Sequence, residues 1–342
     1  MVEDSPSLEE WRRLYEASIS IKALAPWEWM SEDIVFGVQN AETGQLGFVS
    51  VMGMLGEHFS VAVYLGAVGL YGFWSIESEQ EGDYPERILE IPQLQASWED
   101  RNTLRKEDRE LIKELGLKFR GRNEWPMFRS YRPGYAPWFL EAEEARFLAD
   151  VLEQALDVIE RLDQDRFLLD TEDDESYLVR VPVKQGASVA WEDRIVQVPP
   201  PEPTSIRMIM DIGLLETLKS RPQGTYSVEV DFSMFPGPFR DRGERPYYAY
   251  SLLTVESQSS FIVGHELLQV ETTLEDLWGT LPFHLVNHFA KFGAVPRQVR
   301  VRTVLLEQLL EPLAEELGFR LRRSKSLRSL DEVKHFLLDR FI

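Results

Sequence analysis

The strand that decides the fold of the C-terminal half reads Thr225-Tyr226-Ser227-Val228-Glu229-Val230-Asp231-Phe232-Ser233. Apolar and polar residues alternate along it, which is the period of a β-strand. Because successive side chains of a strand point to opposite faces, Glu229 and Asp231 lie on the face opposite Val228 and Val230. We predict a strand with an apolar face packed on helices and an acidic face in solvent.

The segments around this strand alternate between strand and helix patterns. A short helix is predicted near residues 206–218. Further strands are predicted at 247–256, 261–268, 298–302 and 319–323, and further helices at 274–292, 305–317 and 330–341. From residue 225 onward, the order is three strands, helix, strand, helix, strand, helix. This order predicts an α/β domain over residues 205–342.

A proline-rich stretch precedes this domain and reads Pro199-Pro200-Pro201-Glu202-Pro203. It has no hydrophobic period, and such a composition is typical of a semi-rigid spacer. A chain of 342 residues is also long for one core. We therefore predict two domains, at residues 1–198 and 205–342, joined by a linker at residues 199–204.

The N-terminal domain mixes strands and helices in another arrangement. Ser7 and Glu10 form a capping-box pattern that predicts a first helix. Strands are predicted at 34–39, 46–52, 59–65, 177–183 and 188–198, and helices at 104–115 and 140–162. The predicted fold class of the whole chain is α+β, with a strand meander and helices in the first domain.

Composition limits the possible functions. The chain has no cysteine, which excludes disulfides and thiolate metal sites and favours a reducing compartment, so we expect a cytoplasmic protein. No apolar run is long enough to cross a membrane. The net charge is −21, but residues 291–342 carry a net +4, which leaves −25 for the residues before them. The most acidic run is Asp170–Glu175, with five acids in six residues.

The predicted element order of the second domain resembles the ribonuclease H-like core of retroviral integrases and transposases. In that superfamily the first strand carries a catalytic Asp, which the resemblance places at Asp231. The family's Gly-x-Pro step is similar to Gly293-Ala294-Val295-Pro296, and its leucine-glycine-apolar segment is similar to Leu317-Gly318-Phe319. The resemblance places the second catalytic Asp at Arg302, where a guanidinium would repel Mg²⁺, so it implies a degenerate domain.

The whole chain also resembles an uncharacterised bacterial family of two adjoining domains of unknown function. In the first domain the resemblance depends on Ala25-Pro26-Trp27-Glu28-Trp29-Met30 and Val51-Met52-Gly53. In the second it depends on Arg245-Pro246-Tyr247-Tyr248 and on Pro296-Arg297-Gln298-Val299-Arg300-Val301-Arg302. This resemblance implies an identity but no activity.

Basic residues of the last two predicted strands are the first candidates for binding an anion. They are Arg300, Arg302, Arg320, Arg322 and Arg323. Alternate residues of a strand share a face, so Arg320 and Arg322 together with Arg300 and Arg302 form a positive patch if the strands are neighbours. The alternative, which we favour, is a solvated or salt-bridged surface.

A second candidate is the segment at residues 120–138, in which aromatic residues lie among arginines and prolines predict an irregular path. Its candidate binding residues are Trp125, Arg129, Arg132 and Trp138. Rings and guanidinium groups in such a mixture can bind single-stranded nucleic acid by stacking and phosphate contacts. We favour the alternative that the rings cover the first core.

The sequence contains no complete metal site built from histidines and no phosphate-binding loop. His284 and His288 are four residues apart on a predicted helix, but no third ligand is evident, so we expect structural histidines and no metal. No Walker loop, dinucleotide fingerprint or nucleophile elbow is present in the sequence, so we expect no cofactor.

These observations favour a non-catalytic binding or adaptor protein. The acidic first domain would engage either a partner protein or the C-terminal half of the same chain, and its acidity disfavours nucleic acid there. The alternative is a metal-dependent nuclease or phosphotransferase in which Asp231 acts with Glu256 or Glu307, since two-metal chemistry needs converging carboxylates.

Overall fold

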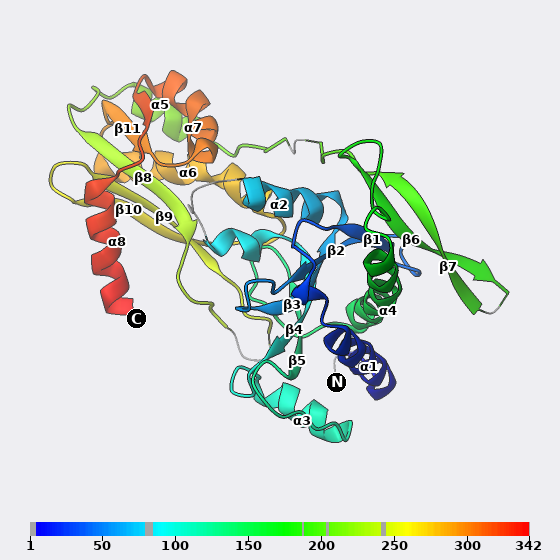
Figure 1. Ribbon diagram of the computed structural model, residues 1–342. Helices are drawn as coiled ribbons and strands as arrows, with labels where there is room; N and C mark the ends of the chain where they lie inside the picture. Colours follow the sequence, from blue (N-terminus) through cyan, green and yellow to red (C-terminus); the bar gives the residue numbers. More distant parts are fainter. Residues whose placement is uncertain (1–4, 79–84, 187, 203–204, 241–243, 342) are drawn as a thin grey trace. The chain divides into compact units, whose positions relative to one another are not determined.

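The computed structural model describes residues 5–78, 85–186, 188–202, 205–240 and 244–341 (Figure 1). The chain divides into two compact units. The first unit comprises the chain up to Arg132 and from Pro137 to Glu202, and the second comprises residues 133–136 and the chain from Pro203 onward. Pro203 and Thr204, the end of the predicted linker, lie outside the described residues. Each unit contains both helices and a sheet, as the predicted α+β class requires.

The first unit is built on a seven-stranded sheet with the order β5-β4-β3-β2-β1-β6-β7. Its strands are β1 (Phe36–Gln39), β2 (Leu46–Met52), β3 (Phe59–Leu65), β4 (Gln93–Glu99), β5 (Trp125–Tyr131), β6 (Ser176–Gln185) and β7 (Ser188–Gln197). Neighbouring strands are antiparallel except β1 and β6, which are parallel. The predicted meander is therefore present as β1 to β3, and β4 and β5 extend it.

Strand β5 corrects the prediction of an irregular path through residues 120–138. It is an edge strand of the sheet, next to β4, and Ser130 near its end also forms an isolated antiparallel bridge with Trp138. Pro126 lies within it, opposite Trp98. Because proline has no N–H to donate, it is tolerated on an edge strand, where one side of the backbone needs no partner.

Helices cover both faces of the first sheet. They are α1 (Leu8–Leu24), α2 (Gly66–Ser78), α3 (Lys106–Glu114) and α4 (Ala142–Gln164), with 3₁₀ turns at Pro26–Glu28 and Pro85–Glu90. Helix α1 begins with the predicted capping box, in which Ser7 N donates to Glu10 Oε2 (2.6 Å) and Glu10 N donates to Ser7 Oγ (3.3 Å). The apolar residues of α1 and α4 pack on one face, and those of α2 pack on the other.

The second unit contains a five-stranded sheet with the order β10-β9-β8-β11-β12. Its elements are α5 (Ile212–Lys219), β8 (Ser227–Met234), β9 (Ala249–Glu256), β10 (Ile262–Gln269), α6 (Leu274–Phe292), β11 (Gln298–Val301), α7 (Val304–Leu317), β12 (Arg320–Arg323) and α8 (Arg328–Phe341). Strands β8, β9 and β10 are antiparallel neighbours, whereas β11 is parallel to both β8 and β12. The predicted order of elements is confirmed.

Two separate apolar clusters place the helices of the second unit. Residues of α5, α6 and α7 pack with Val228 and Val230 on one face of the sheet. Helix α8 packs on the opposite face, where Leu330 and Val333 contact Leu253 and Val255. In the described part of the chain, no helix is long and apolar enough to span a bilayer.

Candidate functional site

The acidic face of β8 lies under helix α8. Glu229 and Asp231 point away from Val228 and Val230, as the alternation predicts, but each is only 1% exposed. The expectation that this face meets solvent is therefore wrong. The sheet alternation determines which residues share a face, and α8 then covers that face.

Glu229 is held by two donors. Arg300 Nη2 lies 2.6 Å from Glu229 Oε1, and the backbone N–H of Leu330 donates to Oε2 at 2.9 Å. Leu330 is in the first turn of α8, where backbone N–H groups have no partner within the helix. The buried carboxylate therefore caps α8 and fixes the start of the helix on the sheet.

Asp231 is held by the helix that covers it. Lys334 Nζ, from α8, donates to Asp231 Oδ2 and also to Ser233 Oγ (2.8 Å). The other oxygen, Oδ1, is buried and has no hydrogen bond among the described residues. Arg302 Nε is 4.0 Å from Oδ1, and the Arg302 guanidinium donates to Asp331 of α8.

We refer to six of these residues as the charged layer: Glu229, Asp231, Arg300, Arg302, Asp331 and Lys334. Three are acidic and three are basic, so the layer is neutral overall. Buried charges are stable only when paired and hydrogen-bonded, and the layer meets this condition except at Asp231 Oδ1. A metal ion at Asp231 would have to displace Lys334.

The structure does not bring the two other candidate catalytic carboxylates to Asp231. Glu256 is paired with Val228, so it belongs to the opposite face of the sheet. Glu307 is on α7, with its Oε2 3.8 Å from Arg323 Nε. Within the described ranges, no three His, Asp or Glu side chains gather as metal ligands.

The register of the last two strands shows which arginines share a face. Arg300 is paired with Arg322, and Gln298 with Arg320, so Arg320 and Arg322 share the face of Arg300 and Glu229. Both are exposed on the edge strand β12, and neither has an ion pair among the described residues. We call this pair the β12 arginines.

The predicted Arg and aromatic residues of the first unit make ion pairs and ring contacts within that unit. Arg129 makes two hydrogen bonds to Asp108 (2.9 and 2.6 Å), and the two side chains are 6% and 8% exposed. Arg132 is paired with two glutamates. Trp125 and Trp138 each pack edge-on against a phenylalanine, with ring centroids 5.9 and 5.1 Å apart. In this geometry Arg129 is closed to a phosphate.

The structure places one of the two α6 histidines, His288, in the interior of the second unit. His288 is 0% exposed, and its Nδ1 is 2.9 Å from Thr254 Oγ1. A Cβ on Gly264 would lie 2.2 Å from the His288 ring, so the glycine makes room for it. Burial lowers the pKa of His288 to about 4 and also lowers the pKa of His284, so both rings are neutral at pH 7.

The sequence-based prediction missed the role of Lys334. A signal was present, because Lys334 is four residues after Leu330 and three before Leu337, which puts it in the apolar stripe of α8. A basic residue within such a stripe indicates a buried acidic partner on the surface that the helix covers.

Two family models match the chain. A domain of unknown function (DUF7309) matches residues 11–180, and another domain of unknown function (DUF6930) matches residues 214–338. The chain belongs to a two-domain family of unknown function. No match was found among curated proteins or among solved structures. All six residues of the charged layer lie in the segment that matches DUF6930.

Proposed function

We propose that this member of the DUF7309–DUF6930 family is a non-catalytic binding protein, and that the β12 arginines bind an acidic segment of a partner protein. The observation that carries the proposal is the contact of Lys334 with Asp231. A nuclease of this shape would need cations between converging carboxylates, and here the protein supplies the cation from its own α8.

The charge distribution supports a protein rather than a nucleic acid as the partner. The chain carries −21 in total, which disfavours long polyphosphates, and the basic excess is limited to its C-terminal part. A small basic surface on an exposed strand edge suits a short acidic peptide, which can add main-chain hydrogen bonds to the open edge of β12. The lack of cysteine supports a cytoplasmic setting.

The test is binding of a fluorescent oligoglutamate peptide, measured by anisotropy at low salt. The variant Arg320→Glu/Arg322→Glu should weaken binding about tenfold or more, because each reversed contact costs on the order of 1 kcal/mol. The matched control Arg207→Glu/Arg221→Glu reverses two exposed arginines of the same unit that are remote from β12 in sequence and should change affinity little. Equal weakening by both variants, or no peptide binding by the natural protein, would overturn the proposal.

The ribonuclease H-like resemblance supplies the competing function. The order of elements supports that resemblance as a proposal about the fold, and so does the position of Asp231 on β8, the first strand of this sheet in chain order. If the protein is a nuclease, it should cleave DNA or RNA in the presence of Mg²⁺ or Mn²⁺, and the variant Asp231→Asn should not. Such cleavage would establish catalysis and end the proposal of a non-catalytic protein.

A further inference from the structure

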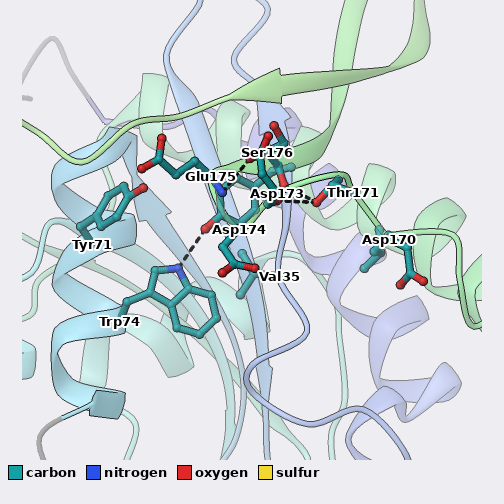
Figure 2. Close-up of a pocket in the computed structure, with 11 residues that line it drawn as sticks. Val35, Tyr71, Trp74, Asp170, Thr171, Asp173, Asp174, Glu175 and Ser176 are labelled. Carbon is teal, nitrogen blue, oxygen red and sulfur yellow. Dashed lines mark hydrogen bonds between the residues drawn. The ribbon is translucent and has the colours of Figure 1, made fainter.

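A pocket of about 740 Å³ lies in the first unit, beside α2 and the start of β6 (Figure 2). It is lined by Val35, Tyr71, Trp74, Leu169, Asp170, Thr171, Asp173, Asp174, Glu175, Ser176 and Tyr177. The volume is in the range of sites that hold small organic ligands. The acidic run predicted from the sequence forms one wall, and three aromatic residues form another.

The aromatic wall offers ring surfaces whose orientation is fixed. Trp74 Nε1 donates to Tyr177 Oη (3.1 Å), and Tyr71 Oη donates to the carbonyl oxygen of Val198 (2.8 Å). Both donors are therefore already used within the protein. Tyr177 is 9% exposed, and its hydroxyl oxygen keeps a second lone pair that can accept a hydrogen bond.

The acidic wall has no cation of its own. Among the described residues, none of Asp170, Asp173, Asp174 and Glu175 has an ion-pair partner. Other acidic residues of this unit do have partners: Arg13, for example, lies 2.5 Å from Asp150 and 2.6 Å from Glu153. The pocket is therefore a place where the unit leaves negative charge uncompensated next to ring faces.

Cations bind where carboxylates and ring faces meet, because the face of an aromatic ring attracts positive charge. Burial is the main cause of the raised pKa of Tyr177, the hydrogen bond from Trp74 opposes it, and the nearby Asp174 and Glu175 carboxylates raise it further. In Figure 2 the carboxylates follow the loop from Glu175, near Tyr71, to Asp170 on the side away from it. An elongated ligand with more than one positive charge matches this spacing better than a single ion.

We propose that this pocket binds a linear aliphatic polyamine. One ammonium group lies against Tyr71 and Trp74 and donates to Glu175, while the others donate to the carboxylates along the loop. The alkyl segments lie on the apolar part of the lining. The site is independent of the β12 arginines, so neither proposal depends on the other.

The test is isothermal titration of the full chain with spermidine. Glu175→Gln and Asp174→Asn each remove one charge from the lining and should raise the Kd about tenfold, as loss of a charge-assisted contact does. Glu172→Gln is the matched control, because Glu172 belongs to the same acidic run but does not line the pocket. It should raise the Kd less than about threefold, since only a long-range charge effect remains.

Two further ligands separate the possible explanations. A neutral diol of the same length should not bind, and Mg²⁺ should not compete with spermidine at equal concentration, since it lacks the alkyl contacts. Equal weakening by Glu172→Gln and Glu175→Gln would show diffuse attraction to the acidic run and overturn the proposal. Binding of oligolysine without binding of spermidine would also overturn it, in favour of a protein partner. Unchanged thermal unfolding of each variant shows that a loss of binding is not a loss of fold.

Discussion

Replacing Lys334 by methionine removes the cation that holds Asp231 and keeps an unbranched side chain of similar length. Asp231 is 1% exposed, and the nearest remaining cation, Arg302 Nε, is 4.0 Å from Oδ1. Removing one partner of a buried ion pair costs about 3–5 kcal/mol, because the other charge stays buried. Lys334 is 29% exposed and Arg302 compensates in part, so we expect the lower end, about 3 kcal/mol.

The assay is urea denaturation at pH 7, followed by circular dichroism. The matched control is Lys291→Met, because Lys291 is also paired with a carboxylate in this unit, at 3.4 Å from Glu266, but is 69% exposed. An exposed pair contributes about 0–1 kcal/mol, so this variant should unfold near the natural midpoint. Equal destabilisation by the two variants would refute the idea that Asp231 is a buried charge that depends on Lys334.

A double substitution completes this test. Asp231→Leu/Lys334→Met replaces the buried pair by apolar side chains, a change that is often neutral or stabilising by about 1–4 kcal/mol. We therefore expect the double variant to recover most of the stability lost in Lys334→Met. If it loses as much as the single variant, the cost arises from the packing of α8 and not from the charge of Asp231.

The remaining predictions concern other buried polar groups. Arg129→Leu leaves the Asp108 carboxylate, whose side chain is 8% exposed, without its cation. It should lower the free energy of unfolding, measured by urea denaturation, by about 3–5 kcal/mol. An unchanged midpoint would mean that water reaches this pair. His288 has a folded pKa of about 4 against about 6.5 when unfolded, so the unfolded state takes up the proton first and stability falls by about 2 kcal/mol from pH 7 to pH 5. His288→Gln should flatten that slope, and an unchanged slope would assign it to other groups. Gly264→Ala places a methyl group against the His288 ring and should lower the free energy of unfolding by about 1–3 kcal/mol. Gly213→Ala, on the exposed side of α5, should raise it by up to about 1 kcal/mol. Equal melting temperatures of the two variants would contradict this.

The elements of the second unit could be predicted because their patterns are strong. Strand β8 alternates strictly, and α6 and α7 show apolar residues at helical spacing between clear stops such as Gly293 and Gly318. These signals are local, so they do not depend on knowing the tertiary contacts.

Helix α2 could not be predicted in this way. Its sequence from Gly66 to Ser78 is apolar almost throughout, so it shows no polar face and no helical period. Its glycines predict turns instead. The structure gives another reason for Gly69: a Cβ there would lie 2.8 Å from the backbone of Tyr64 and 2.9 Å from the carbonyl oxygen of Pro92. Close packing of α2 on β3, which is a tertiary effect, requires this glycine.

The candidate site was predictable only in part for the same reason. The alternation of β8 indicates that Glu229 and Asp231 share a face, but it contains no information on what covers that face. A helix was predicted at residues 330–341, where the structure has α8. Its position over β8, however, depends on the packing of Leu330 and Val333 against Leu253 and Val255, which are far away in the sequence. The pairing of Asp231 with Lys334 follows from that packing.

Charge compensation separates the structural charges of this protein from those available for binding. The charged layer, like the Arg129–Asp108 pair, contains as many acids as bases, and its carboxylates Glu229 and Asp231 are buried, so a ligand would have to break an ion pair to reach them. The β12 arginines and the acidic wall of the pocket have no ion-pair partners among the described residues. A ligand of opposite charge can therefore bind at these two sites without breaking an ion pair of the protein, so the electrostatic attraction favours binding.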